Sequence, residues 1–354
     1  MDRHKVVVAM SGGVDSSVTA CLLHEQGYEV VGMGIRSWPT EFCNEDSKKS
    51  CYSPEDACAD ASRLGITFYL LSFEELFREK VIDYFISEYT LGRTPNPCIP
   101  CNDHIRFGAL LLRARGMGYD YVATGHYARV TYDSEKNRYL LREAKDSKKD
   151  QSYVLFGLTQ EKLRQILFPI GERTKEEVRA EARRFGLRVA DKPESQDACF
   201  LHEKDYRTYL SEQGIEAEGG EIVDEKGKLL GRHPGIHAFT IGQRNGVGVA
   251  VGKPVYVTAI DVKQNRLVIG PRESLARREI WVDRMNWVSE ELSEGDSKPL
   301  AVKIRYRNPK AQATVKRWGD SCQVTFAEPA YAVTPGQACV FYDDDVVVGG
   351  GWIR

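Results

Sequence analysis

A glycine- and serine-rich turn near the N-terminus is the first segment whose residue types suggest chemistry. Residues 11–17 read S-G-G-V-D-S-S and follow the apolar run Lys5 to Met10. Paired glycines let backbone N–H groups turn inward around an anion, and the start of a following helix adds the positive end of its dipole. Ser11, Ser16 and Ser17 add hydroxyl donors. The segment is predicted to bind phosphate groups, in preference to a plain Gly-Gly turn with a serine cap.

The pattern also indicates which phosphate is attacked. A Walker loop needs G-x-x-x-x-G-K-[ST], and neither Gly227-Lys228 nor Gly252-Lys253 is followed by Ser or Thr. The sequence has no G-x-G-x-x-G fingerprint either. S-G-G-x-D-S-S after an N-terminal strand resembles the pyrophosphate loop of ATP pyrophosphatases, which adenylate a carbonyl or carboxyl oxygen. A loop without its own lysine suits that reaction, because the α-phosphate is attacked and pyrophosphate leaves. Asp15 is expected to help hold the Mg²⁺ that neutralises the pyrophosphate.

Three cysteines form the second signal. Residues 94–102 contain a C-x-x-C pair, Cys98 and Cys101, between prolines, and Cys199 lies in the segment 192–200. A helix predicted to begin after Asn102 would place its N-terminus near Cys101. We therefore expect a lowered pKa for the Cys101 thiol, because the positive end of a helix dipole stabilises a thiolate.

Three kinds of cysteine chemistry compete. A structural zinc site needs four ligands, the fourth from a further Cys or a His, but no second C-x-x-C exists. A thioredoxin-like pair is expected after the first strand of its own fold. Cys101 with Cys199 fits sulfur transfer, in which one thiol carries a persulfide and the other resolves it by forming a disulfide. Structural, incidental or core roles are expected for the remaining cysteines: Cys21, Cys43, Cys51, Cys58, Cys322 and Cys339.

The pattern along the chain predicts how these groups are positioned. Strands of a parallel doubly wound sheet, buried on both faces and separated by helices, account for the first two hundred residues. Beyond residue 205 short β-branched runs alternate with turn signals, which is typical of all-β units. The expected fold class is α/β plus all-β, with domains at 1–204, 205–276 and 277–354. The expected strands are 5–10, 28–35, 66–71, 121–124, 255–260, 267–269, 301–306, 323–326 and 338–342, and the expected helices follow residue 13, start after Ser53, and cover 73–89 and 103–115.

Composition narrows the function classes. The chain has 354 residues with 42% hydrophobic and 28% charged residues, which is typical of a globular protein. A formal net charge of −2 excludes a globally basic nucleic-acid coat but leaves a local basic face open. No run approaches the about 18 apolar residues of a membrane span, and the N-terminus lacks the features of a secretory signal. We expect a cytoplasmic protein with no membrane partner.

Five further segments, taken with the loop and the cysteines, resemble one family. They are A-T-G-H-Y-A at 123–128, K-D-Q-S-Y at 149–153, F-T-I-G-Q-R at 239–244, K-I-R-Y-R at 303–307 and T-P-G-Q at 334–337. Over nearly its whole length the chain resembles the tRNA-specific 2-thiouridylases (the MnmA family). The resemblance implies ATP-dependent transfer of sulfur to C2 of the wobble uridine, with ATP and Mg²⁺ as cofactors. The implied partners are the tRNA anticodon stem-loop and a persulfide donor, such as a cysteine desulfurase or a relay protein.

The resemblance also implies residue roles. Cys101 would be the nucleophile and Cys199 the persulfide carrier. ATP would be held by Ala9, Met10, Ser11, Gly12, Gly13, Val14, Asp15, Ser16, Ile35 and Gly125. Contacts to tRNA would come from Asn96, Pro97, Cys98, His126, Lys149, Asp150, Gln151, Arg305, Tyr306 and Gln337.

One position departs from the family pattern and opens an alternative. Many members have Asp where this chain has Cys98, which gives N-P-C-x-x-C in place of N-P-D-x-x-C. Cys98, Cys101 and Cys199 could then hold a 4Fe–4S cluster with one open iron site, and the same thiolation would use that cluster. A second alternative is an amidotransferase or ligase with a pyrophosphate loop, which uses a nitrogen nucleophile and needs no cysteine pair.

Basic residues near the C-terminus are expected to form a phosphate-binding face. They alternate with apolar residues on predicted strands, so several would share one side of a sheet. The alternative is an ordinary solvated sheet face. The residues are Lys303, Arg305, Arg307, Lys310, Lys316 and Arg317, with Lys148, Lys149, Arg277 and Arg278 as extensions.

Overall fold

The computed structural model describes residues 4–37, 53–193, 198–201 and 204–354. The expectations for Cys43 and Cys51 lie outside the described residues, as does part of the segment before Cys199. No helix of the described residues is long and apolar enough to cross a membrane.

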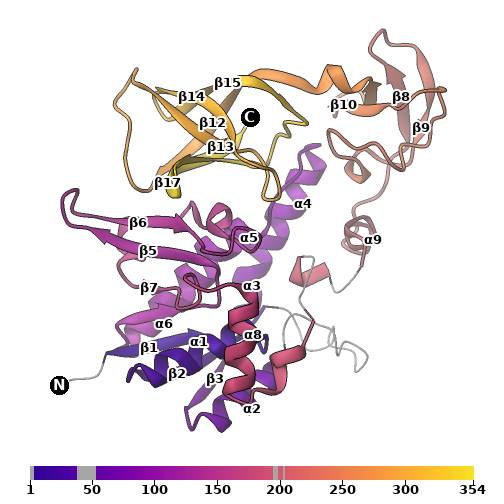
Figure 1. The fold of residues 1–354 in the computed structure, drawn as a ribbon. Helices are drawn as coiled ribbons and strands as arrows, with labels where there is room; N and C mark the ends of the chain where they lie inside the picture. Colours follow the sequence, from indigo (N-terminus) through magenta and orange to yellow (C-terminus); the bar gives the residue numbers. More distant parts are fainter. Residues whose placement is uncertain (1–3, 38–52, 194–197, 202–203) are drawn as a thin grey trace.

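A parallel five-stranded sheet forms the base of the molecule, with strand order β3-β2-β1-β4-β7 (Figure 1). Side chains of β1 point alternately to opposite sides of the sheet, so its valines make both faces apolar. Helices cover both faces. Val6 and Val8 pack in one cluster with residues of α1 and α2, whereas Val7 packs with residues of α6. The expected doubly wound sheet is thereby confirmed. Its elements are β1 (Lys5–Ala9), α1 (Val14–Glu25), β2 (Glu29–Arg36), α2 (Pro54–Arg63), β3 (Phe68–Ser72), α6 (Leu110–Gly116), β4 (Tyr121–Ala123), β7 (Ile166–Leu167) and α8 (Lys175–Arg184).

Two helical stretches carry the residues around the cysteines. The helix expected at 73–89 consists of α3 (Glu74–Phe77), a π-helical turn η2 (Arg78–Ile82) and α4 (Asp83–Thr90). The next helix begins at α5 (Cys98–Pro100) and continues through the π-helical η3 (Cys101–Ala109) into α6, so it starts several residues before the expected position. Prolines indicated a loop here, yet proline is tolerated in a first helical turn, where its missing N–H has no intrahelical acceptor.

Two β units follow, as expected from the all-β pattern. The smaller has strand order β10-β11-β8-β9, and the larger closes into a barrel because β12 pairs with both β15 and β17. The strands are β8 (Gly220–Asp224), β9 (Leu229–His233), β10 (Tyr256–Asp261), β11 (Arg266–Gly270), β12 (Ala276–Trp287), β13 (Ser297–Lys303), β14 (Ala311–Trp318), β15 (Ser321–Tyr331), β16 (Ala338–Asp343) and β17 (Val346–Ile353). Short helices are η4 (Ser152–Leu155), α7 (Gln160–Leu163), η5 (Arg188–Asp191), η6 (Cys199–Leu201), α9 (Tyr206–Glu212), η7 (Ile236–Ala238) and η8 (Arg272–Leu275).

A hairpin that the sequence analysis did not anticipate connects the first sheet to the barrel. β5 (Ala128–Asp133) and β6 (Arg138–Glu143) are antiparallel, and Arg142 of β6 pairs with Val346 of β17. The hairpin lies between the parallel sheet and the barrel in Figure 1. The alternation of strands and helices in this region gave no sign of a hairpin. Its neighbouring strand, β17, follows about two hundred residues later in the chain.

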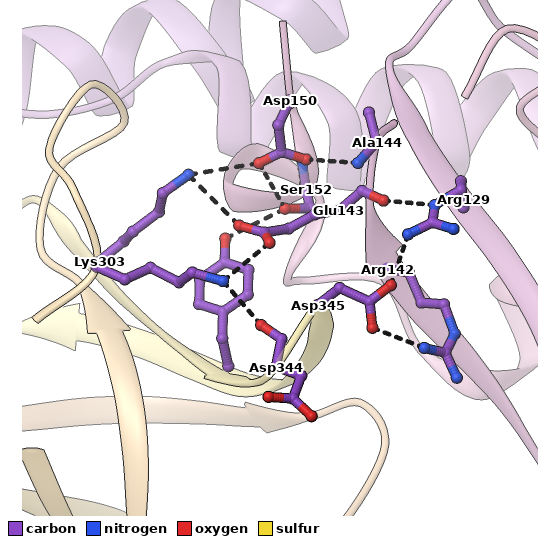
Figure 2. A network of polar contacts seen from close by, with 11 residues as sticks. Arg129, Arg142, Glu143, Ala144, Asp150, Ser152, Lys303, Asp344 and Asp345 are labelled. Carbon is purple, nitrogen blue, oxygen red and sulfur yellow. Dashed lines mark hydrogen bonds and ion pairs between the residues drawn. The ribbon is translucent and has the colours of Figure 1, made fainter. Parts of the chain in front are cut away.

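A buried carboxylate fastens this junction (Figure 2). One oxygen of Asp150 accepts from the backbone N–H groups of Ala144 and Ser152, at 3.1 and 3.2 Å. The other accepts from the Ser152 hydroxyl at 2.9 Å and faces the Lys303 ammonium of β13 at 3.4 Å. Glu143 lies 2.9 Å from the Lys310 ammonium and 3.9 Å from that of Lys303. The turn after β6 is therefore tied to the barrel by charge as well as by strand pairing.

Replacing Asp150 should loosen the junction. We expect Asp150→Ala to lower the free energy of unfolding by about 3–5 kcal/mol, because it leaves a largely buried ammonium without its nearest carboxylate. Chemical denaturation of the whole chain measures the change. Glu135→Ala, at an exposed position of the β5–β6 turn, serves as control and should stay within about 0.5 kcal/mol of the parent. Equal midpoints for Asp150→Ala and the control would contradict this account of the junction.

Candidate nucleotide and sulfur-transfer site

The glycine-rich turn has the backbone of an anion-binding loop. Gly12 has φ of +78°, and a Cβ there would lie 2.1 Å from the carbonyl oxygen of Ser53. The N–H of Ser53 also donates to the Ser11 carbonyl at 2.8 Å, which brings the start of α2 against the loop. Gly13 caps α1 without a side-chain hydrogen bond. The loop thus needs glycine at position 12, and it meets the N-termini of two helices, whose dipoles favour an anion.

Ser16 holds the loop closed. Its hydroxyl accepts from the N–H of Ser11 at 3.2 Å and donates to the Gly13 carbonyl at 3.0 Å. The Ser11 hydroxyl lies 3.4 Å away from it. These contacts close the loop on itself, and its binding of ATP stays a prediction.

Asp15 has an internal cation as its partner. The Lys175 ammonium lies 2.8 Å from each of its carboxylate oxygens, and the Tyr127 hydroxyl donates to one of them at 2.8 Å. Lys175 is buried, whereas Asp15 is about one-third exposed. Asp15 can serve a metal ion at the loop only if it shares its oxygens with Lys175.

A second lysine reaches the loop. The Lys192 ammonium donates to the Gly12 carbonyl at 3.0 Å and to Asp56 of α2 at 2.8 Å. This contact depresses the pKa of Asp56 against the opposing effect of burial. The sequence analysis named neither Lys175 nor Lys192. A signal for Lys175 existed, because Thr174 and Glu177 form a capping box that puts a lysine at the first position of a helix, where a cation is disfavoured.

The remaining residues predicted to bind the nucleotide differ in how far their side chains are buried. Gly125 passes close over the start of α1, since a Cβ there would lie 2.7 Å from the Asp15 carbonyl carbon. Ile35 and Ala9 are half-buried and pack against the cluster under α6. Met10 and Val14 bury their side chains in the core, so they offer backbone atoms to a ligand.

Cys101 and Cys199 pack against one apolar cluster. This cluster contains Phe77, Phe85, Ile105 and Phe200, and both cysteines are half-buried at its margin. Burial raises the pKa of the Cys101 thiol. The expectation of a lowered pKa was therefore wrong, because the apolar surroundings outweigh the nearby helix start. Both cysteines therefore border one cluster, and their meeting beside the nucleotide stays a prediction.

The iron–sulfur alternative does not fit the described residues. Among them, no group of three or more His, Cys, Asp or Glu side chains is arranged to hold a metal ion. Cys98 is exposed, whereas Cys101 and Cys199 lie against the apolar cluster. For the same reason, the residues that the structure describes contain no set of side chains arranged as a zinc site.

The predicted tRNA-contacting loop faces the barrel. The N–H of Cys98 donates to the Asn96 side chain at 3.1 Å, in the turn where Pro97 precedes the helix. Burial, the Asp150 carboxylate and the Cys98 thiol raise the pKa of Tyr306 to about 12. Tyr306 packs against the cluster that contains Ile99 and Tyr153, so the barrel meets the helix that begins at Cys98.

Arg305 and Gln337 make internal contacts. Arg305 donates to the Ile241 carbonyl at 2.9 Å and to the Thr334 hydroxyl, and burial lowers its pKa. Gln337 donates to the Thr94 carbonyl at 2.7 Å. Thr94 in turn donates from its hydroxyl to Thr240 at 3.1 Å. These side chains join the three parts of the chain beside the Asn96–Cys98 turn, so they position that turn whether or not they also touch RNA.

Other predicted RNA contacts are also held internally. His126 is buried between the rings of Phe107 and Phe168, and its Nδ1 lies 2.7 Å from the Thr124 hydroxyl. Gln151 and Tyr127 exchange hydrogen bonds of 2.9 and 2.8 Å, while Lys149 is half-buried.

The expected basic face is neutralised in part. Lys303 and Lys310 pair with Asp150 and Glu143, and Arg317 lies 2.7 Å from Glu291. The expectation that the residues share a strand was wrong for Arg305 and Arg307, because β13 ends at Lys303 and a turn follows. Arg307 is exposed.

Comparison with known proteins identifies the family. The chain is 46% identical to the tRNA-specific 2-thiouridylase MnmA of Acetivibrio thermocellus, over 100% of both chains. It is 50% identical to that of Carboxydothermus hydrogenoformans, over 99% of this chain and 98% of the relative. The chain belongs to the tRNA-specific 2-thiouridylase family.

Domain families match three successive regions. Residues 4–203 match the tRNA methyl transferase HUP domain, 207–271 the tRNA methyl transferase PRC-barrel domain and 277–353 the aminomethyltransferase beta-barrel domain. Among solved structures, a 4-thiouridine synthetase–RNA complex with bound ATP matches 59% of this chain and 50% of its own, at 16% identity and a TM-score of 0.36.

Thiol labelling should separate the two cysteines of the C-x-x-C pair. Iodoacetamide reacts with thiolates, so at neutral pH we expect exposed Cys98 to be labelled before Cys101, whose raised pKa keeps it protonated. Labelling of Cys101 should accelerate as the pH rises and should level off at a higher pH than for an ordinary thiol, because burial raises the pKa of Cys101. Peptide mass spectrometry measures both, with buried Cys339 as the unlabelled reference. Equal rates at pH 7 would contradict the assignment.

His126 should make stability depend on pH. Burial and the nearby Arg106 hold the pKa of His126 well below its usual value, while the unfolded chain takes up that proton near pH 6.5. The unfolding free energy should therefore fall as the pH drops below about 6.5, by up to about 1.4 kcal/mol per pH unit for this group. Denaturation of His126→Gln at two pH values should show a smaller fall. His24→Gln, at an exposed position, should match the parent; the same slope in both variants would refute the prediction.

Proposed function

We propose that this protein installs sulfur at C2 of the wobble uridine in tRNA, at the expense of ATP. The observation that carries the proposal is that one chain contains a closed glycine- and serine-rich loop at Ser11–Ser16 and two cysteines, Cys101 and Cys199, that border one apolar cluster. Membership of the 2-thiouridylase family supports the same reaction, since its relatives bear that name.

The first step activates the base. The C2 oxygen attacks the α-phosphorus of ATP, pyrophosphate leaves, and AMP remains on that oxygen as a good leaving group. The loop N–H groups and hydroxyls would bind the phosphates, with Gly125 and Ile35 beside the nucleotide. Mg²⁺ would supply charge neutralisation for the leaving pyrophosphate, and Asp15 is the loop carboxylate that would hold it.

The second step transfers sulfur. The terminal sulfur of a Cys199 persulfide attacks C2, and AMP departs with the former C2 oxygen. The Cys101 thiolate then attacks the Cys199 sulfur, which breaks the bridging S–S bond and leaves sulfur on C2. The product is a Cys101–Cys199 disulfide, which an external dithiol reduces by two electrons. The persulfide comes from a donor such as a cysteine desulfurase or a relay protein.

The base must leave its stack to reach these groups. Flipping a base costs a few kcal/mol, and less from a single-stranded anticodon loop. We infer that the turn at Asn96, Pro97 and Cys98 receives the base, with Tyr306 facing it from the barrel and Lys149 and Arg307 near the RNA backbone. We place the reaction in the cytoplasm, where a reducing environment keeps such thiols free.

Single-turnover thiolation tests the cysteine roles. With ATP and persulfide-loaded protein, Cys101→Ser and Cys199→Ser should each reduce product at least about 100-fold, because each removes a nucleophile in the sulfur step. Cys58→Ser, at an exposed cysteine, should keep the parental rate. Full activity in either site variant would refute the assignment. Iron and acid-labile sulfide in anaerobically purified protein would favour the cluster alternative, and activity that survives thiol alkylation would favour the amidotransferase or ligase alternative.

A further inference from the structure

The Lys175–Asp15 pair is placed against local electrostatics. Lys175 is the first residue of α8, where the helix dipole disfavours a cation. Its side chain is only 7% exposed, so desolvation of the ammonium adds to that cost. Two contacts of 2.8 Å to Asp15 offset the cost, yet a buried ion pair is weak evidence of stabilisation. A residue that breaks a local rule in this way is expected at a functional site.

Lys192 repeats the arrangement on another part of the loop. Its ammonium lies 3.0 Å from the carbonyl oxygen of Gly12 and 2.8 Å from Asp56, and its side chain is 18% exposed. The two ammonium groups therefore touch positions 12 and 15 of one short loop. Each comes from a segment distant in sequence from the loop, and each contacts a carboxylate, Asp15 or Asp56.

We propose that Lys175 and Lys192 bind the β- and γ-phosphates of ATP and the pyrophosphate derived from them. They would provide the positive charge that a Walker lysine provides from within its own loop, and which S-G-G-V-D-S-S lacks. When the phosphates arrive, they replace part of the carboxylate contacts of the two ammonium groups, and Asp15 becomes available to the accompanying cation. The inference rests on the proposed function, because it requires ATP at this loop.

Ligand binding by charge-removed variants tests the proposal. Calorimetry at fixed Mg²⁺ would measure ATP, pyrophosphate and AMP with Lys175→Met and Lys192→Met. Each variant should bind ATP and pyrophosphate about 10- to 100-fold more weakly, as expected for loss of one charge-assisted hydrogen bond. AMP, which lacks the β- and γ-phosphates, should bind within about two-fold of the parent, and Lys175→Arg should recover most of the pyrophosphate affinity.

Two further variants keep the outcome decisive. Lys145→Met removes an exposed lysine outside α8 that pairs with Glu177, a residue of the helix that contains Lys175. This variant should leave the affinities for ATP, pyrophosphate and AMP unchanged. If Lys175→Met does not fold, the double variant Asp15→Asn/Lys175→Met keeps the loop neutral and should fold while still losing pyrophosphate affinity. Unchanged pyrophosphate binding in both lysine variants would overturn the proposal, as would equal weakening of all three ligands. A parent protein that binds no ATP would instead overturn the proposed function.

Discussion

A buried carboxylate is stable only where hydrogen-bond donors or cations surround it. Asp150 has such partners in two different parts of the molecule. Its partners are backbone and hydroxyl groups of its own turn and an ammonium of the barrel. An unpaired carboxylate at this depth would cost several kcal/mol, so the turn and strand β13 are held in one relative position. The next residue, Gln151, exchanges hydrogen bonds with Tyr127, whose hydroxyl reaches Asp15. One short segment therefore supports both the barrel and the phosphate loop.

The same logic explains why several motif residues have structural contacts. Arg305 and Gln337 come from segments that match the family, yet their side chains join the barrel to Ile241 and Thr94. A motif states which residue type stands at a position but not which way the side chain points. If the Asn96–Cys98 turn receives the base, as proposed above, residues that fix its position affect the reaction as strongly as residues that touch the substrate.

The sequence could predict the parts of the fold that depend on local pattern. The β1 valines pack as expected, Ser53 caps α2, and most β-branched runs after residue 205 form strands, although the strand expected at 301–306 ends at Lys303. It could not predict the β5–β6 hairpin, whose partner strand lies near the C-terminus, or the two-residue β7. The loop was predicted because its glycines and serines are contiguous. Lys175 was not, because it lies 160 positions from Asp15 and only folding brings the two together.

The raised pKa of Cys101 bears on when this thiol can react. A nucleophilic thiol is useful only as thiolate, yet a thiolate of higher basicity is intrinsically the stronger nucleophile. Apolar surroundings therefore keep Cys101 protonated at rest, which protects it from stray oxidants and alkylating agents. In the reaction proposed above, the Cys101 proton must be removed before this thiol attacks the Cys199 sulfur. Under that proposal, the burial of Cys101 makes sulfur release depend on deprotonation of this thiol, which a permanently ionised thiol on the surface would not need.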